Sequence, residues 1–200
     1  MKKIVITLLL GFSLINQVWA IQSPQVLVQE TSEKMLATLK AEEKLLQQEP
    51  GRIYELVNEI VIPHFDFEYM SQLVLAKYWR RASPEQRAAF TSEFRTLLVR
   101  TYAKSLQEYT HQVIHFLPFR EVSSGDVTVR TEVEQPGSFP IPIDYRLHQK
   151  GGEWKVFDVI IDDVSLVTNY RSSFAKEIRQ SGIDDLISSL AKRNKEASGE

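Results

Sequence analysis

The sequence contains no cysteine among its 200 residues. Thiol catalysis and cysteine-based metal sites are therefore excluded. Disulfides are excluded as well, although small secreted domains usually depend on them, so core packing alone must hold this fold together. The chain is long enough for one domain with a substantial core, and its 43% hydrophobic and 25% charged residues are ordinary for a globular protein.

The sequence also lacks an excess of one charge. It has 24 Lys and Arg against 26 Asp and Glu, which gives a formal net charge of −2. Without Lys2 and Lys3 the balance is 22 against 26, or −4. We therefore expect no nucleic-acid partner and no strong electrostatic adhesion to anionic lipid.

Long apolar runs are missing after the first twenty residues, and no later segment is predicted to cross a membrane. Residues 1–20 have the pattern of a signal peptide, with two lysines before an apolar run from Ile4 to Ile15. Val18 and Ala20 occupy the two positions that a signal peptidase recognises, so we expect cleavage after Ala20. We therefore predict an exported protein of the bacterial periplasm, with a single domain over residues 21–200.

The first half of that domain has the spacing of apolar residues that is typical of helices. Ser23-Pro24 predicts the start of a first helix, and Pro50-Gly51 predicts its end. A second helix is expected to end at Pro63, and Asp66 can cap a short third helix.

The clearest local signal is Ser83-Pro84-Glu85-Gln86, a capping box with proline at the first helical position. The helix that it opens is expected to run to about Tyr109. Its inner face is predicted to consist of Phe90, Phe94, Leu97, Leu98, Thr101 and Ser105. A long helix with so many large apolar groups indicates contact with a broad surface such as a sheet.

Strand patterns follow in the second half of the chain. The predicted strands are residues 113–119, 127–134, 141–148 and 154–161, joined by short turns, which indicates an antiparallel meander. Two helices close the chain, the first capped by Asn169 and ended by Gly182. The predicted fold class is α+β, with helices packed on one face of a curved four-stranded antiparallel sheet.

No catalytic signature stands out in the sequence. His111 and His115 have the spacing of a metal-binding pair on a helix, but they lie where a helix gives way to a strand and no HExxH glutamate accompanies them. Asp158, Asp162 and Asp163 are the best candidates for acid–base chemistry, because a carboxyl among apolar residues can have a raised pKa. The turn that ends the strand explains these aspartates better, so we expect no metal and no cofactor.

Large rings are plentiful on the surfaces that are predicted to face one another between the helices and the sheet. They are Phe67, Trp79, Phe94, Tyr102, Tyr109, Phe116, Tyr145, Phe157 and Tyr170. These rings could fill a core, or they could line an apolar pocket that has tyrosine hydroxyls at its mouth. The residues alone leave both interpretations open.

The run GGEWKVFDVIIDDVSLVTNYRSSF, residues 151–174, resembles the most characteristic segment of the MlaC family, also called toluene-tolerance or ABC-transporter auxiliary proteins. Residues 65–106 and 181–190 agree with the same family in order and spacing. The sequence departs from the family pattern at Ala76 and Asp163, where glycine is usual. An aspartate at position 163 would bear a positive φ less easily than glycine.

The resemblance implies a soluble periplasmic phospholipid carrier without enzymatic activity, with an NTF2-like cone and an internal apolar pocket for acyl chains between helices and sheet. It also implies two partners, an outer-membrane lipoprotein–porin complex and an inner-membrane ABC transporter with an MCE-domain subunit. We expect the carrier to be a monomer. Two alternatives stay open: an NTF2-like enzyme that acts on a small apolar substrate through Asp158 or Asp162, and a transporter adaptor that binds no lipid.

Ten residues are predicted to contact the lipid tails. Each is apolar or amphipathic and is expected to face the gap between the helices and the sheet, with a place in a dry core as the alternative. They are Trp79, Phe94, Leu98, Tyr102, Leu106, Val129, Tyr145, Val164, Leu166 and Tyr170.

Overall fold

The computed structural model describes residues 22–107, 112–118, 120–121, 125–134, 137 and 139–196. The predicted signal peptide, Tyr109 and His111 lie outside this part of the chain, and what was predicted for them stays a prediction. Within the described ranges, no helix combines the length and the hydropathy that a membrane span requires.

Short helices form the N-terminal part of the fold. The helix α1 (Pro24–Ala41) begins after Ser23, as predicted, although the serine side chain makes no capping hydrogen bond. The chain then turns into α2 (Glu43–Gln48), so the predicted first helix is in fact two helices. The helix α3 (Arg52–Leu56) continues directly into the π-helical turn η1 (Val57–Val61). A 3₁₀ turn that contains proline follows and ends this helical stretch.

The helices α4 (Phe67–Leu75) and α5 (Pro84–Gln107) both begin at the predicted caps. The carboxylate of Asp66 accepts a hydrogen bond from the N–H of Tyr69 at 3.1 Å. The predicted capping box at the start of α5 closes in both directions, with serine and glutamine joined by hydrogen bonds of 2.9 and 3.2 Å. The 3₁₀ turn η3 (Ala76–Tyr78) follows α4 directly.

The sheet contains the four predicted strands, β1 (Ile114–Phe116), β3 (Val127–Val133), β4 (Ile141–Lys150) and β5 (Glu153–Ile161). Two short strands, β2 (Arg120–Glu121) and β6 (Val164–Ser165), enlarge it to six strands in the described part of the chain. The order is β1-β3-β4-β5-β6, with β2 also on β3, and every pairing of these strands is antiparallel. The predicted meander is therefore confirmed.

The two closing helices are α6 (Leu166–Ser181) and α7 (Ile183–Glu196). The prediction that Asn169 caps α6 was wrong, because Ser165 caps it instead: its hydroxyl accepts the N–H of Thr168 at 3.1 Å. Asn169 lies inside the helix, which starts directly after β6. Gly182 ends α6 with φ at 92°, as predicted.

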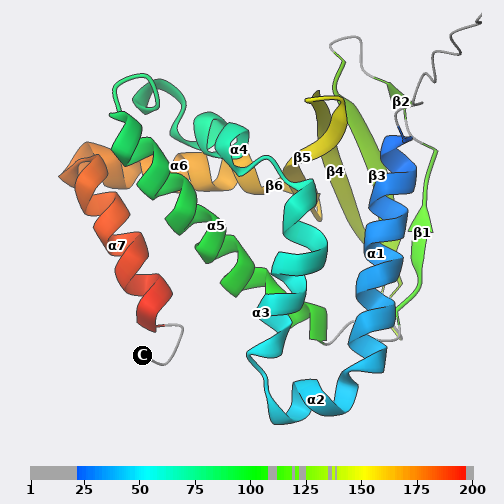
Figure 1. The fold of residues 1–200 in the computed structure, drawn as a ribbon. Helices are drawn as coiled ribbons and strands as arrows, with labels where there is room; N and C mark the ends of the chain where they lie inside the picture. Colours follow the sequence, from blue (N-terminus) through cyan, green and yellow to red (C-terminus); the bar gives the residue numbers. More distant parts are fainter. Residues whose placement is uncertain are drawn as a thin grey trace, which may run out of the picture.

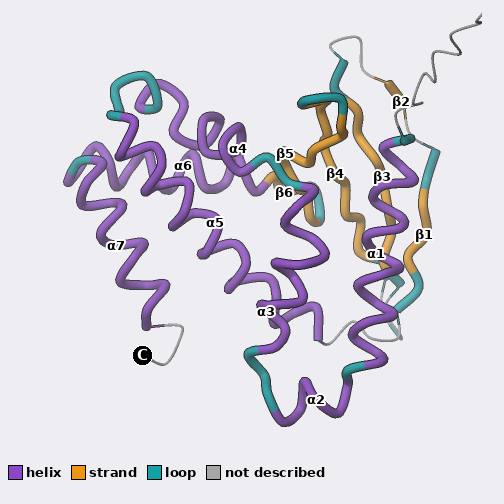
Figure 2. The backbone as a smooth tube through the Cα atoms, in the orientation of Figure 1, coloured by secondary structure: helices purple, strands orange, loops and turns teal. Residues whose placement is uncertain are grey.

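The predicted α+β class is confirmed by the arrangement of these elements. Figures 1 and 2 show the strands on one side of the molecule and α4 to α7 on the other, and α1 lies against β3. Buried apolar side chains form two groups. The sheet–helix cluster joins the sheet to α1 and α4–α7, and its members include Phe90, Phe94, Leu98, Val129, Leu147 and Phe174. The helical cluster consists of Met35, Leu39, Leu46, Ile53, Leu56, Val57, Ile60, Val99 and Ala103.

The helix α5 contributes to both clusters. Phe94 and Leu98 belong to the sheet–helix cluster, whereas Val99 and Ala103 belong to the helical cluster. Two residues of the predicted inner face, Thr101 and Ser105, are exposed, so that part of the prediction was wrong. The helix buries two sides rather than one because α3 packs on the side away from the sheet–helix cluster.

Candidate functional site

One face of the sheet is apolar across three strands. Val127, Leu147 and Val156 lie opposite one another in a first row across β3, β4 and β5. The second row is Val129, Tyr145 and Val159, and the third row is Thr131, Ile143 and Ile161. A bulge beside Arg146 lets β5 present Val156 and Val159 on the same face although they are three residues apart. These nine side chains make one continuous surface.

Burial of this face decreases along β4 and β5, whereas Val129 and Thr131 of β3 stay buried at 0% and 1% exposure. Every member of the first row is at most 3% exposed. In the second row Tyr145 is only partly buried, and in the third row both Ile143 and Ile161 are partly buried. The apolar surface therefore becomes more accessible toward the end of the sheet where β5 turns into β6.

The helix α6 begins at this more accessible end, because β6 pairs with Ile160 and Ile161 at the end of β5. Tyr170, one turn into α6, packs edge-on against Phe94 of α5 with ring centroids 5.3 Å apart. Tyr102 of α5 makes a hydrogen bond with Tyr170, which places two hydroxyls side by side. The α5–α6 pair thus contributes aromatic rings and two hydroxyls to the partly buried rim of the sheet–helix cluster.

Tyr102 and Tyr145 stay neutral well above physiological pH. Burial, together with the neighbouring Tyr170, raises the pKa of Tyr102 to about 12. Burial also raises the pKa of Tyr145 to about 12, against the opposite effect of a hydrogen bond with Thr131. None of the ten predicted tail-binding residues carries a charge. Such a surface can hold hydrocarbon and offer a few hydroxyls, but it cannot neutralise an ionic group.

The structure places eight of the ten predicted residues in the sheet–helix cluster. Buried members are Phe94, Leu98, Val129 and Leu166, and partly buried members are Trp79, Tyr102, Tyr145 and Tyr170. Leu106 packs instead against the helical cluster, and Val164 is 53% exposed at the start of β6.

Trp79 lies far from the tyrosine pair. Its carbonyl accepts a hydrogen bond from Arg87 Nε at 2.9 Å, and the Arg87 guanidinium lies 5.3 Å from the centroid of the Trp79 ring. Arg87 and Tyr102 are fifteen positions apart on α5 (87 and 102), which corresponds to about 22 Å of helix. Trp79 is therefore at the opposite end of the cluster.

Three residues of the third row, Thr131, Ile143 and Ile161, were missing from the predicted set. Strand alternation held enough information to find two of them, because Thr131 and Ile143 have the same parity as Val129 and Tyr145 on their strands. Ile161 required the bulge in β5, which shifts the alternation and has no sequence signal of its own.

The aspartates considered for acid–base chemistry have structural partners. Asp158 is 1% exposed, and its carboxylate accepts hydrogen bonds from the Ser165 hydroxyl at 2.7 Å and from the Val167 N–H at 3.1 Å. It pairs with Arg146 across the strands, on the face opposite Tyr145. Asp162 and Asp163 form the exposed β5–β6 turn, with φ of 48° and 63°. The carboxylate of Asp158 thus fixes the start of α6 and points away from the apolar face.

His115, one of the two histidines considered for a metal, pairs with a carboxylate. Its Nε2 lies 2.6 Å from Glu134 Oε1 at the sheet edge. Within the described residues, no group of three or more His, Asp and Glu is arranged to hold a metal ion.

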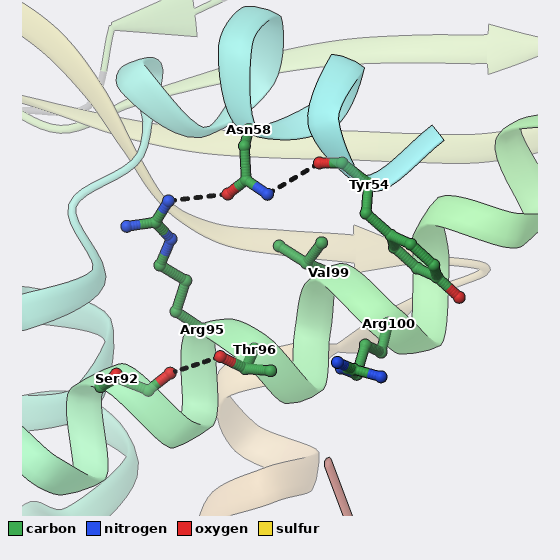
Figure 3. Close-up of a pocket in the computed structure, with 7 residues that line it drawn as sticks. All are labelled: Tyr54, Asn58, Ser92, Arg95, Thr96, Val99 and Arg100. Carbon is green, nitrogen blue, oxygen red and sulfur yellow. Dashed lines mark hydrogen bonds between the residues drawn. The ribbon is translucent and has the colours of Figure 1, made fainter. Parts of the chain in front are cut away.

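A separate pocket lies between α3 and α5, on the side of the helical cluster (Figure 3). Its volume is about 250 Å³. The residues that line it are Tyr54, Asn58, Ser92, Arg95, Thr96, Val99 and Arg100. None of them belongs to the predicted tail-binding set, and the sequence offered no motif that predicted this pocket.

Comparison with known proteins gives a consistent result. The model of the family described as "MlaC protein" matches residues 29–192. The toluene tolerance protein ttg2D of Pseudomonas putida is 30% identical over 92% of this chain and 85% of its own length. The intermembrane phospholipid transport system binding protein MlaC of Haemophilus influenzae is 29% identical over 84% of this chain and 80% of its own length.

A solved structure has the same fold. It is the phospholipid-binding protein of Ralstonia solanacearum in complex with a phospholipid, with 31% sequence identity and a TM-score of 0.81 over 88% of this chain and 99% of that protein. The family match covers most of the chain, and the relatives match it over most of their own length. The chain belongs to the MlaC family.

Proposed function

We propose that this protein is a periplasmic phospholipid carrier that encloses acyl chains between the sheet and the helices α5 and α6, and that it is not an enzyme. The observation that carries the proposal is the continuous apolar face of the sheet, which on β4 and β5 is less buried toward the start of α6. Two relatives support the proposal, because the Haemophilus protein is named for phospholipid transport and the Ralstonia protein was solved with a phospholipid.

The energetics explain why such a carrier needs an apolar site of this kind. A phospholipid with two acyl chains has roughly thirty methylenes, and each gains about 0.8 kcal/mol on leaving water. A lipid monomer free in the periplasm is therefore strongly disfavoured. An apolar pocket and a bilayer are similar solvents for the tails, so transfer between them has a small net free energy and is reversible.

We propose that the tail contacts are made by the partly buried residues at the accessible end, because a ligand can cover their remaining surface without displacing the core. These residues are Tyr102, Ile143, Tyr145, Ile161 and Tyr170, backed by the buried Leu98, Val129 and Leu166. The site has no cluster of cations, which favours recognition of the tails over recognition of the head group.

The partners proposed for this carrier follow from its place between two membranes. One would be an outer-membrane lipoprotein–porin complex, and the other an inner-membrane ABC transporter with an MCE-domain subunit. Because the transfer itself is close to reversible, the direction of transport would be set by the ATPase and not by the carrier.

The first test is native mass spectrometry of the protein purified without detergent, followed by organic extraction and lipid analysis. We expect a protein–phospholipid complex and recovery of the same phospholipid in the extract. Repeated preparations that contain folded protein but no phospholipid would contradict the proposal.

A charge placed on the third row tests the location of the lipid. Ile143→Lys puts an ammonium on a partly buried part of the apolar face, and we expect the bound phospholipid to fall several-fold while the far-ultraviolet circular dichroism is retained. The matched control is Gln149→Lys, an exposed position on the same strand, which should keep its lipid. Equal lipid content in both variants would place the tails elsewhere.

A further inference from the structure

The pocket between α3 and α5 presents two arginines beside a small apolar floor. The residues of α5 that line it are Ser92, Arg95, Thr96, Val99 and Arg100, the spacing of one helix face. From the other side come Tyr54 of α3 and Asn58 of η1. Val99 is 8% exposed and belongs to the helical cluster, so the floor of the pocket is fixed by the core beneath it.

Neither Arg95 nor Arg100 forms an ion pair with a carboxylate of the described residues. Arg95 donates to the Asn58 side-chain oxygen at 2.7 Å, and the Arg100 guanidinium lies 5.9 Å from the centroid of the Tyr54 ring (Figure 3). The nearby carboxylates of α3 and η1 pair with another arginine, because Arg52 holds Glu55 at 2.8 Å and Glu59 at 3.3 Å. The pocket thus keeps two positive charges that no carboxylate of its own walls neutralises.

The walls of the pocket are held in place by local hydrogen bonds. The Asn58 side chain donates to the carbonyl of Tyr54 at 2.7 Å while it accepts from Arg95, and Thr96 donates to the carbonyl of Ser92 at 3.0 Å. Asn58 lies in a π-helical turn, a type of turn that is found frequently at functional sites. The arginine at position 95 is therefore presented in one orientation across the gap between α3 and α5.

We propose that this pocket is a docking site for an acidic segment of a partner protein. Arg95 and Arg100 are five positions apart, about 7.5 Å along the helix axis. Five positions also turn the helix by about 140°, so the two guanidiniums lie at opposite edges of the pocket, one by Asn58 and one by the Tyr54 ring, and acidic side chains of a segment lying across the pocket can meet both. The methylenes of the acidic side chains would lie on Val99 and the Tyr54 ring. Arginine and tyrosine are also the residues that most often dominate the energy of protein interfaces.

A pocket of this size and exposure fits a docked peptide better than a free small anion. It is smaller than the usual pocket for a small molecule, and Arg95 and Asn58 at its rim are exposed. The proposal does not depend on lipid binding, because Arg95 and Val99 lie on the side of α5 away from Phe94 and Leu98. A partner seated here would leave the accessible end of the sheet–helix cluster uncovered.

The test uses ¹⁵N-labelled protein titrated with a hexaglutamate peptide at low salt and followed by NMR. We expect saturable shifts of the Asn58 side-chain amide, the Arg95 and Arg100 Nε–H signals and the backbone of Val99. Raising the salt to about 1 M, where the Debye length falls to about 3 Å, should abolish them. A hexalysine peptide should cause no shifts at these groups.

The decisive variant reverses both charges, Arg95→Glu with Arg100→Glu, and should weaken hexaglutamate binding at least about tenfold. The matched control is Arg80→Glu with Arg179→Glu, two exposed arginines outside the pocket, which changes the net charge by the same amount and should bind like the unaltered protein. If the first pair of reversals impairs folding, Arg95→Gln with Arg100→Gln should weaken binding in the same direction.

Four outcomes overturn the proposal, three with the peptide and one with inorganic phosphate. The peptide shifts fail to map to the pocket, both double variants lose binding equally, or the pocket variant binds as tightly as the unaltered protein. The last titration uses inorganic phosphate in place of the peptide. If phosphate saturates the same NMR signals at the same concentration of negative charge as hexaglutamate, the pocket is a site for a free anion and not for an acidic segment.

Discussion

The helical cluster and the sheet–helix cluster differ in the side chains that build them. All nine buried members of the helical cluster are aliphatic residues, alanine or methionine, and Tyr54 is the one ring that packs against it among the described residues. The sheet–helix cluster buries four phenylalanines and carries a rim of partly buried aromatic and aliphatic side chains. The helical cluster is covered except for the small pocket beside Val99, whereas the sheet–helix cluster leaves a rim of partly buried apolar surface for something else to cover.

The packing of the rings shows how the second cluster keeps its shape without being closed. Phe94 meets Tyr170 at 74°, and Phe90 meets Phe174 at 89°, with centroids 5.3 and 5.8 Å apart. Edge-to-face contacts of this kind add about 0.5–1.5 kcal/mol each beyond area burial, so they stabilise the wall formed by α5 and α6. A ligand can then cover the exposed surface of the partly buried residues on the sheet face while the wall formed by α5 and α6 stays in place.

Truncation within the helical cluster is expected to have the largest effect on stability. Leu39 is 0% exposed, so Leu39→Ala leaves a cavity and should lower the free energy of unfolding by about 2–5 kcal/mol. The phospholipid bound per folded molecule should not change, since the residue does not belong to the sheet–helix cluster. Urea unfolding and lipid extraction on the same sample measure the two quantities.

The matched truncation on the open side is Ile143→Ala. Because Ile143 is only partly buried, the loss should be about 1 kcal/mol, well below that of Leu39→Ala. Equal losses for the two variants would mean that the sheet face is packed as tightly as the helical cluster, and the comparison would no longer point to a ligand site.

Alkaline titration is expected to separate the tyrosines of the sheet–helix cluster. The pKa of Tyr102 and that of Tyr145 are raised from 10.0 to about 12, so folding favours their neutral forms. This contribution to stability is fully present below pH 10 and is lost as the pH rises toward 12. Tyrosinate absorbance should show the late-ionising groups, with one fewer in Tyr102→Phe and one fewer in Tyr145→Phe. If neither variant lowers the number of late-ionising tyrosines, Tyr102 and Tyr145 are not the residues that ionise late.

The sequence predicted those parts of the fold whose signals are local. The capping box before α5, the cap at Asp66 and the stop at Gly182 each depend on a few adjacent residues, and each was found as predicted. Strand alternation likewise predicted the meander and the membership of Val129 and Tyr145 on one face.

The parts of the fold and of the site that the sequence did not predict depend on contacts between residues that are far apart in the chain. The sides that α5 buries are decided by α3 on one side and by α4 and α7 on the other, which helical spacing alone cannot indicate. The start of α6 is fixed by Asp158, which reaches forward to Ser165 and Val167. Val164 was placed in the site for its apolar character, but the β5–β6 turn leaves it exposed.

The departure from the family pattern at Ala76 should cost stability on the open side of the molecule. Ala76 follows α4 with φ of 49° and ψ of −116°, a region that glycine adopts and alanine avoids. Ala76→Gly should therefore raise the free energy of unfolding by about 1 kcal/mol, because relief of the strain outweighs the added chain entropy. Asp163→Gly, at φ of 63°, should gain less, since aspartate tolerates the left-handed region. Urea unfolding that shows Ala76→Gly to be less stable would contradict this account.

Acidification is expected to lower the free energy of unfolding slightly, because it protonates Asp66 on the sheet–helix side of the molecule. Its carboxylate lies 3.0 Å from Lys150 Nζ and 3.1 Å from His148 Nε2, and so ties α4 to β4. Burial alone would raise the pKa of Asp66, but the hydrogen bonds from the Tyr69 N–H and from Lys150 outweigh it and hold the pKa below 3.8. The stability that this group contributes is therefore present above pH 3.8 and is lost as the pH falls further, through the lower pKa of the folded state.

The variant Asp66→Asn separates this charge from the helix cap, because asparagine caps a helix as well as aspartate does. We expect its free energy of unfolding to depend less on pH than that of the unaltered protein once the pH falls below 3.8. Glu68→Gln is the control, since Glu68 lies 3.5 Å from the same lysine but is 72% exposed and should have little effect. Identical acid dependence in Asp66→Asn and in the unaltered protein would show that the charge of Asp66 does not help to hold α4 on the sheet, which would leave that role to apolar contacts and to the backbone hydrogen bond from Asp66 to Val156.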